Sequence, residues 1–402
     1  MMKQADNEAL TRVGPGTPGG ELLRRYWHPV SMAAELTEEK PIKSVTLLNE
    51  KLVVFRMPPA AGETQPRYGM MAEQCPHRLA SLAYGRVDAE GIRCPYHGWK
   101  FNTQGQCIEQ PAEPLESTYK NEILQPAYPV EKLAGILFAY MGPLPAPLLP
   151  RWDALVRTDG RRWVQVQSVI HCNWVQPMEN SVDSSHVFWL HHFNDRNFDS
   201  TRLGNRGEAY IEEHEFIRFE YGIMKCRTSG GKTPDDPPLR DEHPLVFPTI
   251  LRNVRRDKDN KEDFQHYIEM RAPIDDTHTQ RYSVNFIPSD TITTSPDEDP
   301  PHRYFALKDP EGKFYMQHIP SQDAMAWETQ GALADRSKEH LGASDRGVLV
   351  FRKLLREQID IVRAGGEPMG IVRDPVKNEV IHFDVFNEGI GLPRTNAALK
   401  KV

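Results

Sequence analysis

Four potential metal ligands lie in two short segments of the chain, CPH and CPYHGW. The first supplies Cys75 and His77, and the second, after sixteen intervening residues, supplies Cys94 and His97. Paired zinc ligands usually have at least two residues between them, so the single residue between Cys75 and His77 is tight for one ion. In a two-iron, two-sulfide cluster the cysteines bind one iron and the histidines the other. The spacing therefore favours such a cluster over zinc, and Trp99 is expected to shield one side of it.

A second group of potential ligands lies in NWVQPMENSVDSSHVFWLHH, where Asp183, His186 and His191 follow the pattern D-x-x-H-x-x-x-x-H. Two imidazoles and one carboxylate form the facial triad of non-haem Fe(II) oxygenases, which leaves coordination positions open for O₂. Five residues on a regular helix separate two side chains by about 140°. We therefore expect a π-bulge or a helix break between His186 and His191. The alternative is that these histidines lie on a helix surface without a metal. The presence of the first group of metal ligands in the same chain makes this alternative less favoured.

Three stretches of this sequence resemble one enzyme family. The two Cys/His segments resemble the Rieske motif, and E-N-x-x-D-x-x-H-x-x-x-x-H is similar to the mononuclear iron motif of Rieske non-haem iron oxygenases. GPGTPGGELLRRYW near the N-terminus resembles the corresponding segment of phthalate 4,5-dioxygenase-like oxygenase (alpha) components. The resemblance continues through most of the chain, and it implies a [2Fe-2S] Rieske cluster, a mononuclear Fe(II) and O₂ as co-substrate.

The resemblance also implies roles for individual residues around the mononuclear iron. His186 and His191 would be iron ligands, whereas the adjacent His192 does not fit the family spacing. Asp183 would be the electron-transfer bridge, because it would accept one hydrogen bond from His186 and another from the cluster ligand His97. Carboxylates in this position fix the tautomer of the histidine and tune the metal.

The family places its third iron ligand, a carboxylate, at the start of a late helix. Asp323 in IPSQDAMAWETQG fits this position, directly after Gln322. Asp345 is the alternative, but it lies where an acidic residue at a helix N-terminus is already explained. Glu179 and Asn180 would lie beside the iron path or the subunit interface.

The hydrophobic patterns predict an α+β chain in three parts. We expect an N-terminal helical segment over residues 1–40, an all-β Rieske domain over 41–150, and a catalytic domain over 151–402, in which helices cover an antiparallel sheet. The boundary at 150 follows GPLPAPLLP, a stiff proline-rich segment.

Individual elements can be predicted within these parts. The predicted helices cover 20–28 and 176–192, and a later helix has Ser344 as its N-cap and ends at Gly365. Alternation predicts strands over 208–222, 245–256, 263–273 and 280–287. The polar, proline-rich segments 230–243 and 288–301 are expected to be surface loops.

Composition excludes several classes of protein. The 402 residues include 49 Lys and Arg against 56 Asp and Glu, which gives a net charge of −7. Binders of nucleic acid or anionic membranes usually carry a basic excess, so neither partner is expected. The best apolar run, Leu133 to Met141, has about half of the roughly 20 residues that a membrane span needs. The N-terminus lacks the apolar region of a secretory signal, and five cysteines are too few for a disulfide framework. We therefore expect a soluble cytoplasmic protein.

The chain shows no nucleotide-binding motif of its own. No strand-linked G-x-G-x-x-G is present, and GPGTPGG contains two prolines, so NADH and FMN are expected only on a separate flavin and iron–sulfur reductase. The resemblance then implies a homotrimer or stacked trimers, in which His97 of one subunit faces Asp183 of the next.

The predicted function is that of a terminal oxygenase component, an oxidoreductase that hydroxylates an aromatic acid of the phthalate or benzoate type. O-demethylation of a methoxylated, lignin-derived aromatic acid is the alternative within the family. An electron-carrying Rieske ferredoxin and a zinc-stapled binding protein are the rivals outside it, but neither explains the second ligand set. An aromatic carboxylate would need a positive group in its pocket, and Arg252 in FPTILRNV is one candidate.

Overall fold

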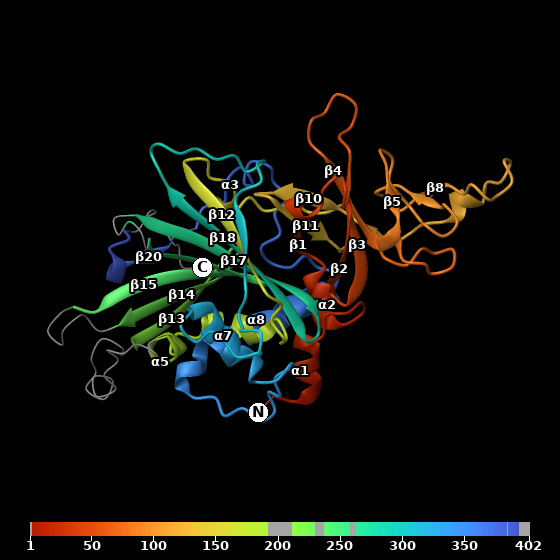
Figure 1. The fold of residues 1–402 in the computed structure, drawn as a ribbon. Coiled ribbons are helices and arrows are strands. Elements are labelled where there is room, and N and C mark those ends of the chain that lie inside the picture. Colours follow the sequence, from red (N-terminus) through yellow and green to blue (C-terminus); the bar gives the residue numbers. More distant parts are fainter. Residues whose placement is uncertain are drawn as a thin grey trace.

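The computed structural model describes residues 2–191, 211–229, 237–257, 260, 263–383 and 385–393. A large twisted sheet occupies the left of Figure 1, with helices beneath it, and a smaller β-rich part projects to the right. The α+β class predicted from the sequence is confirmed. No helix among the described residues is long and apolar enough to cross a bilayer.

The N-terminal segment contains a strand as well as helices. It runs through α1 (Gln4–Thr11), α2 (Pro18–Leu23), β1 (Trp27–Met32) and η1 (Ala33–Glu35). The helix predicted over 20–28 is therefore too long, because α2 ends at Leu23 and a strand begins four residues later. β1 pairs with β11 (Ile136–Tyr140), which also pairs with β10 (Val130–Leu133).

The projecting part is built from two four-stranded sheets. The first has the order β2 (Ile42–Leu47), β3 (Glu50–Met57), β4 (Arg67–Ala72) and β9 (Ala127–Tyr128). The second has the order β5 (Arg86–Val87), β6 (Ile92–Arg93), β7 (Lys100–Phe101) and β8 (Cys107–Glu109), with the short turns η2 (Leu82–Tyr84) and η3 (Tyr119–Glu122) beside it. Val53, Phe55 and Phe101 fill a core that also includes Cys75 and Cys94.

A tight hairpin fixes the projecting part to the large sheet. Leu48 and Asn49 form the two-residue turn between β2 and β3, and both have positive φ angles, of 50° and 66°. Turns of this type match the twist of the strands that they join. The amides of Leu48 and Asn49 donate hydrogen bonds to the carbonyls of Pro273 and Ile274, each at 3.0 Å. The left-handed turn is thus held by strand β17 of the large sheet.

The large sheet has nine strands among the described residues, and all but one neighbouring pair run antiparallel. In spatial order they are β13 (Ile211–Phe219), β14 (Gly222–Ser229), β15 (Leu239–Val246), β16 (Ile250–Arg256), β17 (Phe264–Asp275), β18 (His278–Pro288), β12 (Gly160–Gln167) and β19 (His302–Phe305), with β20 (Phe386–Asn387) on β15. β12 and β19 are the parallel pair. Strand β15 begins inside the segment 230–243 that was predicted to be a loop, so that prediction is wrong over 239–243.

Helices cover one face of the large sheet. They are α4 (Val175–Val182), α5 (His186–Leu190), α7 (Ile319–Glu328) and α8 (Arg346–Arg363), whereas α3 (Asp153–Val156) and η5 (Glu388–Ile390) lie elsewhere. Val348, Phe351 and Leu355 are buried on α8 at helical spacing, and Gly365 after its end has φ 81°. The predicted N-cap, Ser344, is wrong: Asp345 takes that position after the turn η4 (Ala343–Asp345).

Candidate metal centres

The two Cys/His loops have the same backbone design. In each loop the carbonyl of the cysteine accepts a hydrogen bond from the residue four positions later, Leu79 at 2.9 Å and Gly98 at 3.2 Å. Both of these residues have positive φ angles, of 62° and 75°. The left-handed residue turns the chain back, so that His77 and His97 come to the tip of their loops. Their rings lie 4.6 Å apart between centroids.

The four candidate ligands form two layers. Cys75 and Cys94 are buried, whereas His77 and His97 are half-buried at the surface, and the Trp99 ring stacks on His77 at 4.4 Å. Burial, and to a lesser degree the facing Cys94 thiol, raise the pKa of Cys75 to about 12. A bound metal deprotonates such a thiol. Buried sulfur and outward imidazole fit a two-iron cluster with one iron in each layer.

A single zinc ion fits these loops less well. Four ligands of one tetrahedral zinc have donor atoms within about 4 Å of each other, because Zn–S is about 2.3 Å and Zn–N about 2.0 Å. Among the residues that the structure describes, only His186, His191 and Asp323 form a group of three or more such donors within 4.8 Å of one another. The Cys/His donors are therefore spread more widely than one ion requires.

A break between α4 and α5 positions the first histidine of the second centre. α4 ends at Val182, and the backbone of the next residue, Asp183, turns to φ −71°, ψ 134°. The Asp183 carboxylate accepts hydrogen bonds from the amides of Ser185 (2.8 Å) and His186 (3.1 Å), as an N-cap residue does for a new helix. A break was predicted between His186 and His191. The structure has a break before His186, at Asp183, and α5 itself ends at Leu190, so that His191 follows the helix.

The two histidines of this centre use their ring nitrogens in the same way: Nδ1 makes a hydrogen bond to a neighbour, and Nε2 faces Asp323. His186 Nδ1 lies 3.1 Å from Asp183 Oδ2, and His191 Nδ1 lies 2.9 Å from Gln322 Oε1. Gln322 in turn donates its amide hydrogen to the carbonyl of Met316 at 2.7 Å, which fixes its oxygen toward His191. In this arrangement each Nδ1 carries the proton and donates it, so each Nε2 is left with a free lone pair.

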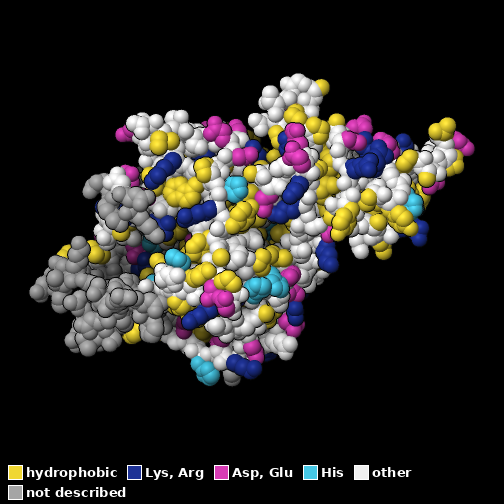
Figure 2. Space-filling view, viewed as in Figure 1, with side chains coloured by type: hydrophobic (Ala, Val, Ile, Leu, Met, Phe, Trp, Pro, Cys, Tyr) yellow, Lys and Arg dark blue, Asp and Glu magenta, His cyan; other side chains and the backbone are white. Residues whose placement is uncertain are grey.

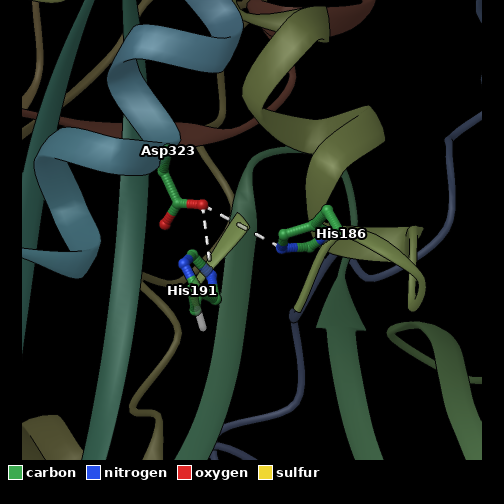
Figure 3. A group of neighbouring side chains, drawn as sticks. All are labelled: His186, His191 and Asp323. Carbon is green, nitrogen blue, oxygen red and sulfur yellow. Dashed lines mark ion pairs between the residues drawn. The ribbon is translucent and has the colours of Figure 1, made fainter. Parts of the chain in front are cut away.

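The free nitrogens face one carboxylate. Asp323 Oδ1 lies 3.5 Å from His191 Nε2 and 3.9 Å from His186 Nε2. Figure 3 shows the three side chains pointing toward one another, His186 from α5, His191 from the residue after it and Asp323 from α7. Asp323 Oδ1 is buried and has no hydrogen-bond partner. A buried, unpaired carboxylate oxygen between two imidazole lone pairs is unfavourable without a cation. The donor set is therefore suited to a metal of the two-histidine, one-carboxylate class.

Asp345, the alternative third ligand, makes a hydrogen bond within its own turn instead of facing the histidines. Asp345 lies at the start of α8, and its Oδ2 accepts a hydrogen bond from the amide of Gly342 at 2.7 Å. It is not part of the group that His186, His191 and Asp323 form. His192, the neighbour of His191, lies outside the described residues.

Asp183 remains ionised beside His186. Burial raises its pKa, but hydrogen bonds from His186 and from two backbone amides outweigh that effect and hold the pKa below its usual value. Asp183 and Asn180 line an open cavity of about 460 Å³ together with His186. That Asn180 lies beside an iron path or a subunit interface stays a prediction.

Glu179 lines the same cavity but is tied into an ion cluster. It accepts hydrogen bonds from Arg336 at 2.9 and 2.7 Å and from Arg352 at 2.5 Å, and only 7% of it is exposed. Burial raises the pKa of the Glu179 carboxyl, but the guanidinium groups of Arg336 and Arg352 outweigh that effect and hold the pKa below its usual range. Glu179 thus joins α4 to α8 and holds the helix that ends just before Asp183.

The prediction for Arg252 is not supported. Its guanidinium donates to both carboxylate oxygens of Asp153, at 3.0 and 2.9 Å, and lies 2.8 Å from His266 Nδ1. The side chain is 1% exposed. Cross-strand pairing puts Arg252 on the same face as Ile268, which belongs to the apolar core on the side of the sheet away from α4 and α7. Arg252 is therefore a structural ion-pair partner.

Sequence reasoning missed Gln322 as a functional residue, although it directly precedes Asp323. Replacement with leucine removes the acceptor that holds His191 in place. We expect Gln322→Leu to bind Fe(II) roughly tenfold to a hundredfold more weakly, the usual cost of losing such a support. Iron retained after dialysis against a chelator series measures this. Gln330→Leu, at the exposed end of the same helical segment, is the control, and equal iron loss in both variants would contradict the assignment.

Comparison with known proteins extends these observations. A model of the Rieske [2Fe-2S] domain matches residues 26–120, and a model described as "LigXa C-terminal domain like" matches residues 306–389. The oxygenase subunit of 5,5'-dehydrodivanillate O-demethylase from Sphingobium sp. is 36% identical, over 97% of this chain and 89% of that protein. The oxygenase subunit of phthalate 4,5-dioxygenase from Pseudomonas putida is 28% identical, over 96% and 92%.

Solved structures agree on the fold. NdmA from Pseudomonas putida CBB5, bound to caffeine, superposes with a TM-score of 0.65 at 21% identity, and the match covers 88% of this chain and 97% of that one. The terminal oxygenase of carbazole 1,9a-dioxygenase from Nocardioides aromaticivorans superposes with a TM-score of 0.58 at 18% identity, over 89% and 98%.

Proposed function

The chain belongs to the Rieske non-haem iron oxygenases, in which it is an oxygenase subunit, and we propose that it O-demethylates a methoxylated aromatic acid. The relative that is 36% identical over nearly the whole chain is named as an O-demethylase subunit, which supports this reaction over ring hydroxylation. Ring hydroxylation remains the second candidate, because the phthalate 4,5-dioxygenase subunit is also similar along its length.

The observation that carries the oxygenase assignment is the unpaired Asp323 oxygen between His186 and His191. These three residues would hold Fe(II), and Cys75, His77, Cys94 and His97 would hold the Rieske cluster. When bound, the iron would supply O₂ binding and activation, and the cluster would supply electrons one at a time. The chain's own contribution is positional: Asp183 and Gln322 fix both imidazole tautomers, and α7 brings in the carboxylate.

The overall reaction balances with electrons from a separate reductase. The substrate methyl ether, one O₂, two electrons and two protons give a phenol, formaldehyde and water. One oxygen atom enters the methyl C–H bond, after which the bond between the methyl carbon and the ether oxygen breaks. A reductase that takes electrons from NADH would work in the cytoplasm, where we expect this system to act.

We also propose that the working form is a homotrimer or a stack of trimers. In Figure 1 the cluster loops lie beside β5 to β8 at the right, whereas α5 and α7 lie at the lower left, so the two centres of one chain are far apart. A second copy would bring its His97 to Asp183 in the open cavity. Exposed side chains near the cluster loops suit such a contact, and they include Leu79, Tyr84 and Tyr96. Figure 2 shows hydrophobic side chains gathered over that projecting region.

Formaldehyde release tests the proposed reaction. We expect the purified chain with a flavin and iron–sulfur reductase, NADH and O₂ to convert 5,5'-dehydrodivanillate or a simpler methoxybenzoate into the phenol. Formaldehyde should form in a one-to-one ratio with oxidised NADH. Phthalate is the comparison substrate, because its ring hydroxylation consumes NADH without formaldehyde. Turnover of phthalate alone would replace O-demethylation by the second candidate.

A further inference from the structure

The face of the large sheet that α4 and α7 cover is polar beneath α7. Side chains alternate along β17, so Ile268 and Met270 enter the apolar core on the far side. Glu269 and Arg271 therefore point to the near side, and Arg281 joins them because it is the cross-strand partner of Arg271. The guanidinium of Arg281 lies 5.9 Å from the ring of Trp327 on α7, which fixes this face as the one toward the metal centre.

Two arginines on this face share one carboxylate. Arg271 donates to Glu269 Oε2 at 3.0 Å, and Arg281 contacts Glu269 Oε1. Arg281 also reaches Gln167 Oε1 at 3.4 Å. The arginines are 1% and 4% exposed, and the Nε–H of each is buried without an acceptor. Buried donors of this kind are rare, and a functional role or contact with a water or an ion is among the explanations for them.

The cluster carries an excess positive charge next to the metal centre. Burial lowers the pKa of Arg271 and of Arg281 to about 10, so both remain protonated at neutral pH. Two guanidinium groups on one carboxylate leave one positive charge. The charge of Asp323 raises the pKa of both arginines, but the two histidines and the metal that they would hold use this charge.

The other groups that face the cluster do not remove this charge. Burial raises the pKa of the Tyr267 hydroxyl, so it stays neutral, and Arg255 over the Tyr267 ring adds a further cation at 5.4 Å. Arg255 donates to Gln265, which is uncharged. A buried positive charge without a counter-ion is costly, and an anionic ligand would remove that cost.

We propose that Arg271 and Arg281, held by Glu269, bind the carboxylate of the aromatic substrate and select for anionic substrates. This inference rests on the proposed function, and it assigns to that reaction a specificity determinant on β17 and β18. The unpaired Nε–H groups offer the hydrogen bonds, and Glu269 keeps both guanidinium groups in place between turnovers. Arg252, on the opposite face of the same sheet, has no part in it.

Equilibrium binding tests the inference without turnover. The holoenzyme is titrated calorimetrically, without O₂, with benzoate, 3-methoxybenzoate and 5,5'-dehydrodivanillate, and with the carboxamide of each. A charge-assisted hydrogen bond accounts for roughly tenfold to a hundredfold in affinity. We therefore expect at least one carboxylate to bind at least about tenfold more tightly than its amide. If no carboxylate of the series outbinds its amide, the inference is wrong.

The variant Arg281→Gln removes the excess positive charge, so that Glu269 and Arg271 remain as an ion pair with no net charge. It should reduce the preference for the carboxylate about tenfold, with little effect on binding of the amide. Arg252→Gln is the matched control, a buried strand arginine from an ion pair on the other face, and it should leave the preference unchanged. A carboxylate preference that persists in Arg281→Gln would overturn the inference. Should that variant fail to fold, a wild-type protein that binds no carboxylate more tightly than its amide still overturns it.

Failure of this inference and failure of the proposed function give different results. If the carboxylate preference is present and is lost in Arg281→Gln, but no formaldehyde forms, the subsite stands and the reaction is wrong. If formaldehyde forms at equal efficiency from a methoxybenzoate and its amide, the reaction stands and the subsite is wrong.

Discussion

Asp323→Ala is expected to reduce O₂-dependent turnover to the background rate and to leave the visible spectrum of the Rieske cluster unchanged. Asp323 supplies the oxygen that both histidine Nε2 atoms face, so its loss leaves only two ligands for the iron. The cluster ligands lie in the projecting β-rich part, which Figure 1 shows at the other end of the molecule from α7. Iron content should fall by about one atom per chain, with sulfide unchanged. Product formation, iron and sulfide assays and the visible spectrum measure the three effects.

Asp345→Ala is the matched control for this variant. Asp345 was the alternative ligand in the sequence, but it caps the turn before α8. Its loss should cost roughly 1 kcal/mol of stability as a lost cap, with iron and turnover retained. If Asp345→Ala loses iron and Asp323→Ala keeps it, the assignment of the third ligand is wrong.

Asp183→Asn is expected to slow electron transfer from the cluster to the iron by roughly a hundredfold, with the fold and most of the iron retained. The amides of Ser185 and His186 donate to separate oxygens of Asp183, Oδ1 and Oδ2. Asparagine keeps one of these oxygens and is as good an N-cap as aspartate, so we expect α5 still to begin there. The change removes the charge that holds His186 and that would accept a hydrogen bond from His97 of a second copy. It therefore separates the bridging role of Asp183 from its structural role.

A single-turnover experiment measures this step directly. The cluster is reduced beforehand, the protein is mixed with O₂ and substrate, and reoxidation of the cluster is followed by its absorbance. Asp335→Asn, an exposed aspartate that lines the same cavity, is the control and should reoxidise like wild type. Unchanged reoxidation in Asp183→Asn would make Asp183 a helix cap alone.

The ligand sets could be predicted from sequence because most of their members are close in the chain. Cys75 with His77, Cys94 with His97, and His186 with His191 are each set by local spacing. The structure brings the two Cys/His loops together at His77 and His97, and it brings His186 next to His191. Asp323 is more than a hundred residues from His191, and only the family resemblance pointed to it.

Features that depend on tertiary context were predicted less well. The break at Asp183 was not predicted, because the pattern of histidines does not reveal that the Asp183 side chain accepts hydrogen bonds from the amides that follow it. The strand Leu239–Val246 was missed because it follows a proline-rich segment and contains charged residues and Pro244, yet its neighbours in the sheet accept them.

The choice among arginines needed the sheet register. Arg252 and Arg271 are both strand arginines in the sequence, and spacing alone does not tell which face each occupies. Pairing of Arg252 with Ile268, and of Arg271 with Arg281, puts them on opposite faces. A basic residue can therefore be recognised as a candidate for the substrate pocket only after the strands are aligned.

Metal and sulfide analysis of the purified chain tests the central claim most directly. One Rieske cluster and one mononuclear iron in each chain predict about three iron atoms and about two acid-labile sulfides, with the red-brown colour of a Rieske protein. Iron should fall by about one atom in Asp323→Ala and by about two in Cys94→Ala, which should also lose the colour. A colourless protein with zinc and no sulfide would contradict the account.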